Sequence, residues 1–221
     1  MYYVQGTIIH NWSRSVLVHQ IESGLYNREG KSPNNFSVAL PKPQSDLAKQ
    51  TLKDPYIFDF LTLTWEHDEK ELENALVEHI TKSLLELGAG FAYVGRQVPL
   101  RVGKSDFYID LLFYHLKLRS YVVIELKTTA FEPEFAGKLN FYLTAVDRQV
   151  RSEQDNPTIG ILICKKKDKI IAEYALSDIR KPIGVSEYKL IHSLPKKIQS
   201  SLPSIKEIEK ELGSKNDRSS K

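Results

Sequence analysis

Apolar side chains recur at helical spacing in several parts of the chain. The clearest stretch is residues 68–88, and a second long helix is predicted from Pro133 to Val146. Residues 10–28 carry a mostly apolar stripe and predict a helix, with Asn11 or Ser13 as its N-terminal cap. Residues 45–53 have the length of a short helix. The apolar face of the clearest stretch consists of Leu72, Leu76, Ile80, Leu84 and Leu87.

The pattern changes to strands between and after the two long helices. Residues 91–98, 107–114 and 121–127 are rich in aromatic and β-branched side chains, and the short link after residue 114 predicts a hairpin. Residues 158–164 are continuously apolar, as in a strand covered on both faces. Residues 183–188 predict an edge strand. From residue 68 the order is therefore αβββαβ, an α/β fold with a mixed sheet flanked by helices.

Three regions follow from these patterns. Residues 1–65 form a helical N-terminal segment, residues 66–194 the α/β domain, and residues 195–221 a basic, partly disordered tail. The aromatic residues Tyr56 and Phe58 have too few apolar partners within residues 1–65 to form a separate core. We therefore expect them to pack on the following domain or on a second subunit.

Composition narrows the class of protein. The 221 residues carry a net charge of +3, which is too small to require a nucleic-acid partner by itself. The single cysteine, Cys164, excludes a disulfide framework, and the expected compartment is the cytoplasm. No stretch of eighteen apolar residues is present, so no membrane span is expected.

Charged side chains interrupt two of the predicted strands. Asp110 lies in the second of the three predicted strands, 107–114, and Glu125 and Lys127 share one face of the third. Two buried carboxylates repel each other, and a divalent cation such as Mg²⁺ removes that cost. The alternative is structural: Lys127 neutralises Glu125, and Asp110 finds a backbone or arginine partner.

In this context the sequence resembles the PD-(D/E)XK nuclease superfamily. Asp110 precedes Glu125-Leu126-Lys127 by about fifteen residues, although no proline precedes the aspartate. Within the superfamily, the chain resembles the YhcG-like bacterial nuclease-domain family. The segments that carry this resemblance are LLELGAGFAYVGRQ (84–97), DFYIDLLFYHLKLRSYVVIELK (106–127), AGKLNFYLTAVD (136–147) and NPTIGILICK (156–165).

The resemblance implies a restriction-endonuclease-like fold and a metal-dependent nuclease that hydrolyses phosphodiester bonds, with DNA a better expectation than RNA. Asp110 and Glu125 would hold Mg²⁺, or Mn²⁺, and Lys127 would orient the attacking water. Related nucleases add a glutamate from the preceding helix, and Glu73 is the candidate because it falls in the apolar arc of that helix; otherwise it reaches solvent. A non-cleaving nucleic-acid-binding or protein-interaction module on the same fold remains the alternative.

Four further residues are candidates for nucleic-acid contacts. Lys138 and Tyr142 lie four residues apart on the second long helix, where a subset of these nucleases carries a Gln-x-x-x-Tyr pair. Arg96 and Gln97 lie on the first predicted strand and can face the same site. The family also implies a larger helical segment before this region, so residues 1–65 would be part of it and could mediate a homodimer.

Overall fold

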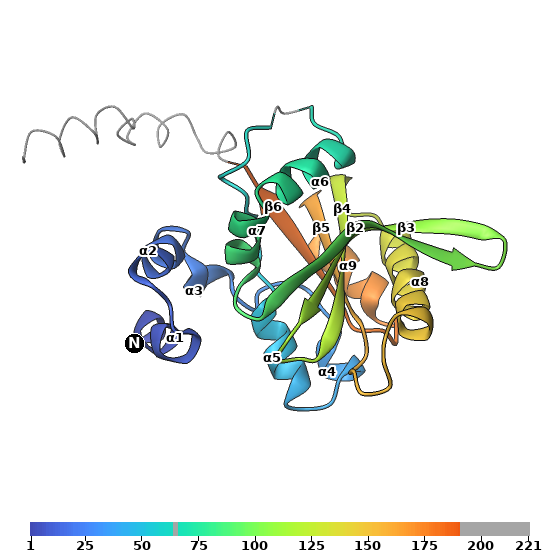
Figure 1. Cartoon of the computed structure of the whole chain (residues 1–221), viewed down its shortest axis with the longest axis horizontal. Helices are drawn as coiled ribbons and strands as arrows, with labels where there is room; N and C mark the ends of the chain where they lie inside the picture. The colour runs from blue at the N-terminus through green and yellow to red at the C-terminus, as the bar shows by residue number, and fades with distance from the viewer. Residues whose placement is uncertain (64–65, 191–221) are drawn as a thin grey trace, which may run out of the picture.

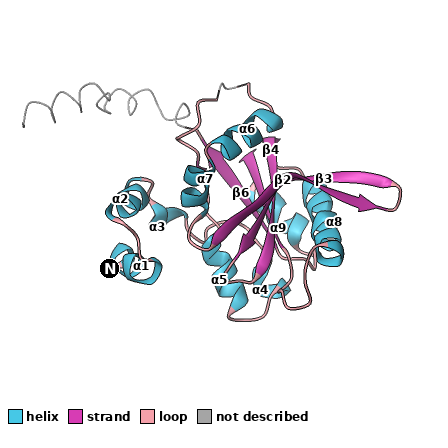
Figure 2. Cartoon of the chain, in the orientation of Figure 1, coloured by secondary structure: helices cyan, strands magenta, loops and turns pink. Residues whose placement is uncertain are grey.

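The computed structural model describes residues 1–63 and 66–190, so the predicted tail lies outside the described residues. In the described part, six strands form one sheet in the order β1-β6-β5-β4-β3-β2, with helices on both faces (Figures 1 and 2). The strands are β1 (Tyr56–Ile57), β2 (Phe91–Val102), β3 (Ser105–His115), β4 (Ser120–Ala130), β5 (Ile159–Lys166) and β6 (Ile183–Lys189).

The strand directions explain how the sheet is connected. Strands β2, β3 and β4 are antiparallel neighbours, because short turns join them. Strands β4, β5, β6 and β1 are parallel, and the longer crossovers between β4 and β5 and between β5 and β6 contain helices. The predicted αβββαβ order and mixed sheet are confirmed.

Two of the predicted helices are each divided in two. The 68–88 stretch breaks at His79, and the 10–28 stretch breaks at Gly24, which has a φ of +64°. Ser13 caps the second helix by accepting from the Val16 amide, and Pro133 begins α8 as expected. The described helices are α1 (Tyr2–His10), α2 (Arg14–Glu22), α3 (Leu25–Arg28), α4 (Phe36–Ala39), α5 (Gln44–Thr51), α6 (Glu69–Glu78), α7 (Ile80–Leu87), α8 (Pro133–Gln149) and α9 (Lys169–Leu176).

Each face of the sheet is covered by its own apolar core. Helices α5, α6 and α7 pack on one face, and α8 and α9 on the other. Strand β4 serves both cores because its side chains alternate: Ile124 and Leu126 join the first, and Val123 joins the second. Glu125 and Lys127 share the alternation of Val123, so the sequence places them on the α8 side.

The aromatic residues Tyr56 and Phe58 of the N-terminal segment pack on the sheet of the same chain and not on a second subunit. Tyr56 and Phe58 are buried, and the Phe58 ring stacks on Tyr188 of β6 with centroids 5.9 Å apart. Strand β1 pairs with β6, with Tyr56 opposite Tyr188, so the prediction that residues 183–188 form an edge strand is wrong. A two-residue strand distant in the sequence has no periodicity by which it could be predicted.

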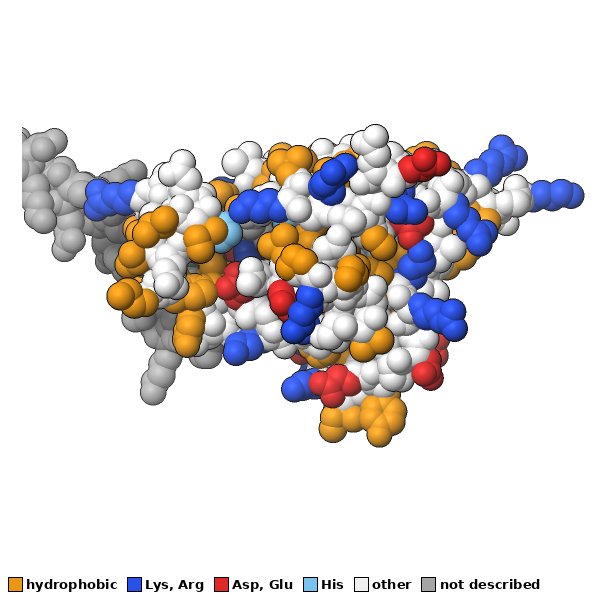
Figure 3. Space-filling view, turned by 90° about the horizontal axis from the view of Figure 1, so that it is seen from below, with side chains coloured by type: hydrophobic (Ala, Val, Ile, Leu, Met, Phe, Trp, Pro, Cys, Tyr) orange, Lys and Arg blue, Asp and Glu red, His pale blue; other side chains and the backbone are white. Residues whose placement is uncertain are grey.

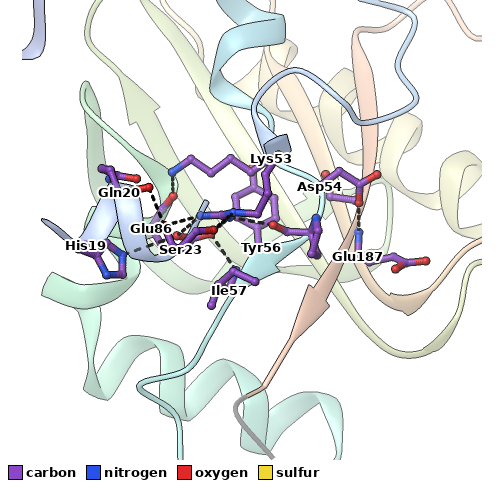
Figure 4. A network of polar contacts seen from close by, with 12 residues as sticks. His19, Gln20, Ser23, Lys53, Asp54, Tyr56, Ile57, Glu86 and Glu187 are labelled. Atoms are coloured by element: carbon purple, nitrogen blue, oxygen red, sulfur yellow. Dashed lines mark hydrogen bonds and ion pairs between the residues drawn. The ribbon is translucent and has the colours of Figure 1, made fainter. Parts of the chain in front are cut away.

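A buried polar network joins the N-terminal helices to α7 (Figure 4). Glu86 is fully buried and accepts from the guanidinium of Arg28 at 2.6 Å and from the Ile57 amide at 2.8 Å. The Lys53 ammonium donates to the Glu86 backbone carbonyl, and burial lowers the pKa of Lys53 to about 8. Residues 28–57 are therefore tied to the α/β domain by charge as well as by apolar packing.

Within residues 1–63 and 66–190, no helix has the length and hydropathy needed to cross a membrane.

Candidate active site

Asp110 and Glu125 lie next to each other where strands β3 and β4 begin to separate. The ladder between these strands ends at the pair Leu111 and Ile124, so the next residue on each strand is a carboxylate. Asp110 continues this contact through its side chain, because its Oδ2 accepts from the Leu126 amide at 2.9 Å. Figure 1 shows β3 diverging from β4 at this end of the sheet.

Glu125 is the most enclosed residue of the site. Its side chain is fully buried, and its Oε1 contacts the ammonium groups of Lys138 at 2.6 Å and Lys127 at 3.1 Å. Its Oε2 is also buried, and no hydrogen-bond partner for it is found in the described part of the chain. One oxygen is thus paired twice, while the other remains without a donor.

Lys127 connects this strand to helix α6. Its ammonium lies 2.8 Å from Glu69 Oε2 and 2.9 Å from the backbone carbonyl oxygen of Leu126, and its side chain is almost entirely buried. Burial by itself would lower the pKa of Lys127, but the pairing with Glu69 and Glu125 outweighs it and raises the pKa. Lys127 therefore stays protonated at neutral pH.

The two carboxylates oppose each other electrostatically. Burial raises the pKa of Asp110 to about 7, and the charge of Glu125 adds to this, although the Leu126 amide and the two lysines act in the opposite direction. Lys138 responds in the complementary way: burial alone would lower its pKa, but pairing with Glu125 raises it. The protonation state of each charged group in this cluster therefore depends on the charges of its neighbours.

Aromatic rings border both lysines on the α8 side. Lys138 Nζ lies 5.3 Å from the ring centroid of Tyr142, and Lys127 Nζ lies 5.4 Å from that of Phe135. Tyr142 is buried, whereas the Lys138 side chain is 45% exposed. Lys138 is thus the member of the cluster that borders solvent, and the spacing of four residues on α8 places Tyr142 beneath it.

The remaining predicted site residues form a separate pair of contacts. Glu73 is buried on α6 and accepts a hydrogen bond from the side-chain amide of Gln97, and burial raises the pKa of Glu73. Arg96 donates to Asn74 Oδ1 at 2.6 Å. These contacts join α6 to β2, and no contact between Glu73 and Asp110 is found in the described part of the chain. The α6 carboxylate that does contact Lys127 is Glu69, one helical turn before Glu73, and it was not among the residues predicted from the sequence.

The donor set fits a hard divalent cation. Asp110 and Glu125 supply carboxylate oxygens, and the unpartnered Glu125 Oε2 gives a buried acceptor that a cation would satisfy. In the described residues, no group of three or more His, Cys, Asp or Glu side chains is arranged to hold a metal ion. Mg²⁺ often binds proteins through one or two carboxylates and completes its shell with water and substrate phosphate, so two carboxylates suffice.

Comparison with known families agrees with this arrangement. Residues 49–203 match the model of a protein family that is described as "YhcG PDDEXK nuclease domain". The chain belongs to this family. The matched range contains the whole carboxylate and lysine cluster, together with the aromatic residues that pack on β6. The resemblance inferred from the sequence motifs is confirmed.

One curated relative and two solved structures are similar to this family member. The Escherichia coli (strain K12) protein "Putative nuclease YhcG" is 34% identical over 192 residues, which are 86% of this chain and 51% of that protein. The chain thus spans about half the length of this relative. A repair endonuclease from Pyrococcus abyssi shares 17% identity over 59% of this chain and 49% of its own, with a TM-score of 0.38. The structure of EndoMS in a complex with dsDNA shares 19% sequence identity over 61% of this chain and 47% of its own, with a TM-score of 0.40.

Proposed function

We propose that this protein is a metal-dependent nuclease that hydrolyses phosphodiester bonds in DNA. The observation that carries the proposal is the placement of Asp110 and Glu125 side by side, with a buried oxygen of Glu125 that lacks a donor. Membership of a nuclease-domain family supports the same reaction class. The cation would be Mg²⁺, with Mn²⁺ as a substitute, because both prefer oxygen ligands.

The chain's own residues would divide the work as follows. A bound cation supplies Lewis-acid stabilisation of charge on the phosphoryl oxygens. Asp110 and Glu125 hold it, and Lys127, fixed by Glu69 and the Leu126 carbonyl, presents a proton donor that orients water or stabilises the charge that develops. Lys138, which borders solvent, attracts the substrate phosphate.

The structural alternative also has contacts in its favour. Lys127 does pair with Glu125, and Asp110 does have a backbone partner. A salt bridge alone, however, does not account for a second lysine on the same oxygen, a neighbouring carboxylate and an unpartnered Oε2, each of which costs free energy when buried. In a non-cleaving module, these residues would lower the stability of the core without contributing to a reaction.

Other roles extend the proposal to the surroundings of the site. Arg96 and Gln97 would contact nucleic acid beside Tyr142 and Lys138, and Glu73 would position Gln97. The exposure of Val4, Ile8 and Ile9 on α1 supports a homodimer through residues 1–65, because exposed apolar side chains gathered on one helix mark a surface for protein contacts. The free, buried Cys164 is compatible with the reducing cytoplasm.

A cleavage panel tests the function. Wild-type protein and Lys127→Ala would be incubated with duplex, single-stranded and branched DNA and with RNA, in Mg²⁺, Mn²⁺ or EDTA. We expect cleavage of DNA by the wild type with either metal, none in EDTA, and at least a 100-fold slower rate in Lys127→Ala. DNA binding that is unaffected by EDTA, without cleavage of any substrate, would select the non-cleaving module instead.

A further inference from the structure

The hairpin formed by β2 and β3 is longer than the sheet that supports it. Strand β4 pairs with β3 only from Leu111 to His115, whereas β2 pairs with β3 along its whole length, from Phe91 to Val102. The outer part of the hairpin therefore projects past Asp110 as a two-stranded ribbon (Figure 1). We call residues 98–109 the outer ribbon; its two-residue turn begins at Gly103, which has a φ of +64°.

One face of the outer ribbon is fixed to helix α8. Leu100 and Ile109 are buried in the α8 core, and the ring of Phe107 packs against Phe141 with centroids 4.8 Å apart. This packing makes the ribbon a rigid arm rather than a free loop, since its apolar side chains are removed from water. Its position relative to the site is thereby set by α8, the helix that also carries Lys138.

The opposite face of the outer ribbon is open to solvent and carries an aromatic ring. Tyr108 is 52% exposed and pairs across the hairpin with Pro99. Of the ring contacts found in the described part of the chain, none involves Tyr108. Tyr26, Tyr108 and Tyr174 are the strongly exposed aromatic residues of that part, and of these three only Tyr108 lies on a strand with a site carboxylate.

The short separation along β3 relates Tyr108 to the site. Tyr108 and Asp110 are two residues apart on β3, about 7 Å along the strand. The hairpin twists at this point, because Ile109 joins the α8 core while Leu111 joins the core on the other face of the sheet. An exposed ring at that distance is roughly one nucleotide from a phosphate bound at Asp110. The tip beyond it carries two cations, Arg101, whose side chain is 75% exposed, and Lys104.

We propose that the outer ribbon binds an unpaired base next to the cleaved phosphodiester bond, stacked on Tyr108, with Arg101 and Lys104 on the adjoining phosphates. The inference rests on the proposed nuclease function and names its substrate class: nucleic acid with a single-stranded segment beside the cut. Aromatic side chains bind single strands because every base offers a face for stacking.

The charge of the ribbon favours this substrate over an intact duplex. Tracking a duplex requires several cations along the phosphates. The ribbon has few, and Asp106 lies 3.8 Å from Arg101, which reduces the net charge of the tip. In Figure 3, Lys and Arg side chains mark the end of the molecule from which the hairpin projects in Figure 1. Within the ribbon, the cations Arg101 and Lys104 lie at the tip, beyond the ring.

Base stacking can be measured with catalysis switched off. A duplex with a single-stranded tail, carrying 2-aminopurine at successive positions of the tail, would be titrated in EDTA with wild-type protein, Tyr108→Phe, Tyr108→Ala and Tyr174→Ala. Tyr174 is 78% exposed on α9 and serves as the matched control. We expect fluorescence quenching at one position with the wild type, Tyr108→Phe and Tyr174→Ala. Tyr108→Ala should lose it and bind the tailed substrate at least fivefold more weakly.

The outcomes separate this inference from the proposed function. Equal quenching and affinity for Tyr108→Ala and the wild type would overturn the stacking role, even if the wild type cleaves DNA with Mg²⁺. A wild type that quenches in a Tyr108-dependent way but cleaves nothing would retain the ribbon as a binding site and remove the nuclease. Equal binding of blunt duplex and tailed substrate would overturn the preference for a single-stranded segment.

Discussion

The ammonium of Lys138 lies 2.6 Å from Glu125 Oε1, so a solvent-bordering lysine of α8 pairs with a fully buried carboxylate of β4. The sequence pattern predicts a phosphate contact for Lys138, and the pairing with Glu125 gives this lysine a second role. A cation at Glu125 competes with any metal ion for the charge of the same carboxylate. Lys138 therefore sets how strongly the two acids bind a cation before substrate arrives.

Replacing Lys138 with glutamine should strengthen cation binding. Lys138→Gln keeps a hydrogen-bond donor for Glu125 and removes one positive charge, so the affinity for Mn²⁺ should rise about two- to fivefold, the modest range reflecting the partial exposure of Lys138. Isothermal titration calorimetry in the absence of nucleic acid measures this directly. Lys169→Gln, at an exposed lysine of α9, is the control and should leave the affinity unchanged. Weaker Mn²⁺ binding by Lys138→Gln would show that its charge does not oppose the cation.

The buried Glu86 should be important for stability. Glu86→Ala leaves the Arg28 guanidinium without its carboxylate and the Ile57 amide without its acceptor, so the free energy of unfolding should fall by about 3–5 kcal/mol. Urea unfolding followed by circular dichroism measures the loss. Glu173→Ala, which removes the exposed pair with Lys169, should change stability by less than about 1 kcal/mol. Similar losses in both variants would contradict a special role for the buried network.

The buried His115 should make stability depend on pH. Burial lowers its pKa to about 4, and its Nδ1 accepts from the Leu118 amide, which requires the neutral ring. Since the unfolded chain binds a proton near pH 6.5, stability from this residue is complete above pH 6.5 and declines as the pH falls toward 4, by about 3 kcal/mol.

His115→Asn isolates this contribution. The asparagine Oδ1 can accept from the same amide but does not titrate, so the difference in unfolding free energy between wild type and variant should shrink as the pH falls from 7 to 4.5. Urea unfolding at several pH values provides the comparison. A difference that stays constant over this range would show that His115 does not cause the dependence.

The main parts of the fold followed from local patterns, and the deviations have local causes. The spacing of apolar residues predicted α8 and the strands around Asp110 and Glu125 because periodicity reports burial directly. It did not predict α1, in which none of the residues is buried. The break at His79 was also missed, because the apolar spacing of the two short helices continues across it.

The α6 carboxylate shows where reasoning from the sequence stops. Glu73 was chosen because it falls in the apolar arc, and it is buried, but its partner is Gln97. Gln97 has a φ of +46° and follows an irregularity in the pairing of β2, between Tyr93 and Gly95, that no helical wheel can represent. Glu69, half-buried and at the first turn of α6, contacts Lys127 instead. Which carboxylate meets the lysine depends on how the helix sits on the sheet.

The most direct test of the central claim combines cleavage and folding in Asp110→Asn. This variant keeps the shape of the side chain and removes one of the two opposing carboxylates, so its melting temperature without metal should equal or exceed that of the wild type. Its Mg²⁺-dependent cleavage of DNA should fall at least 1000-fold under single-turnover conditions. Cleavage within tenfold of the wild type, by a variant that is equally well folded, would contradict the assignment of Asp110 and Glu125 as the catalytic centre.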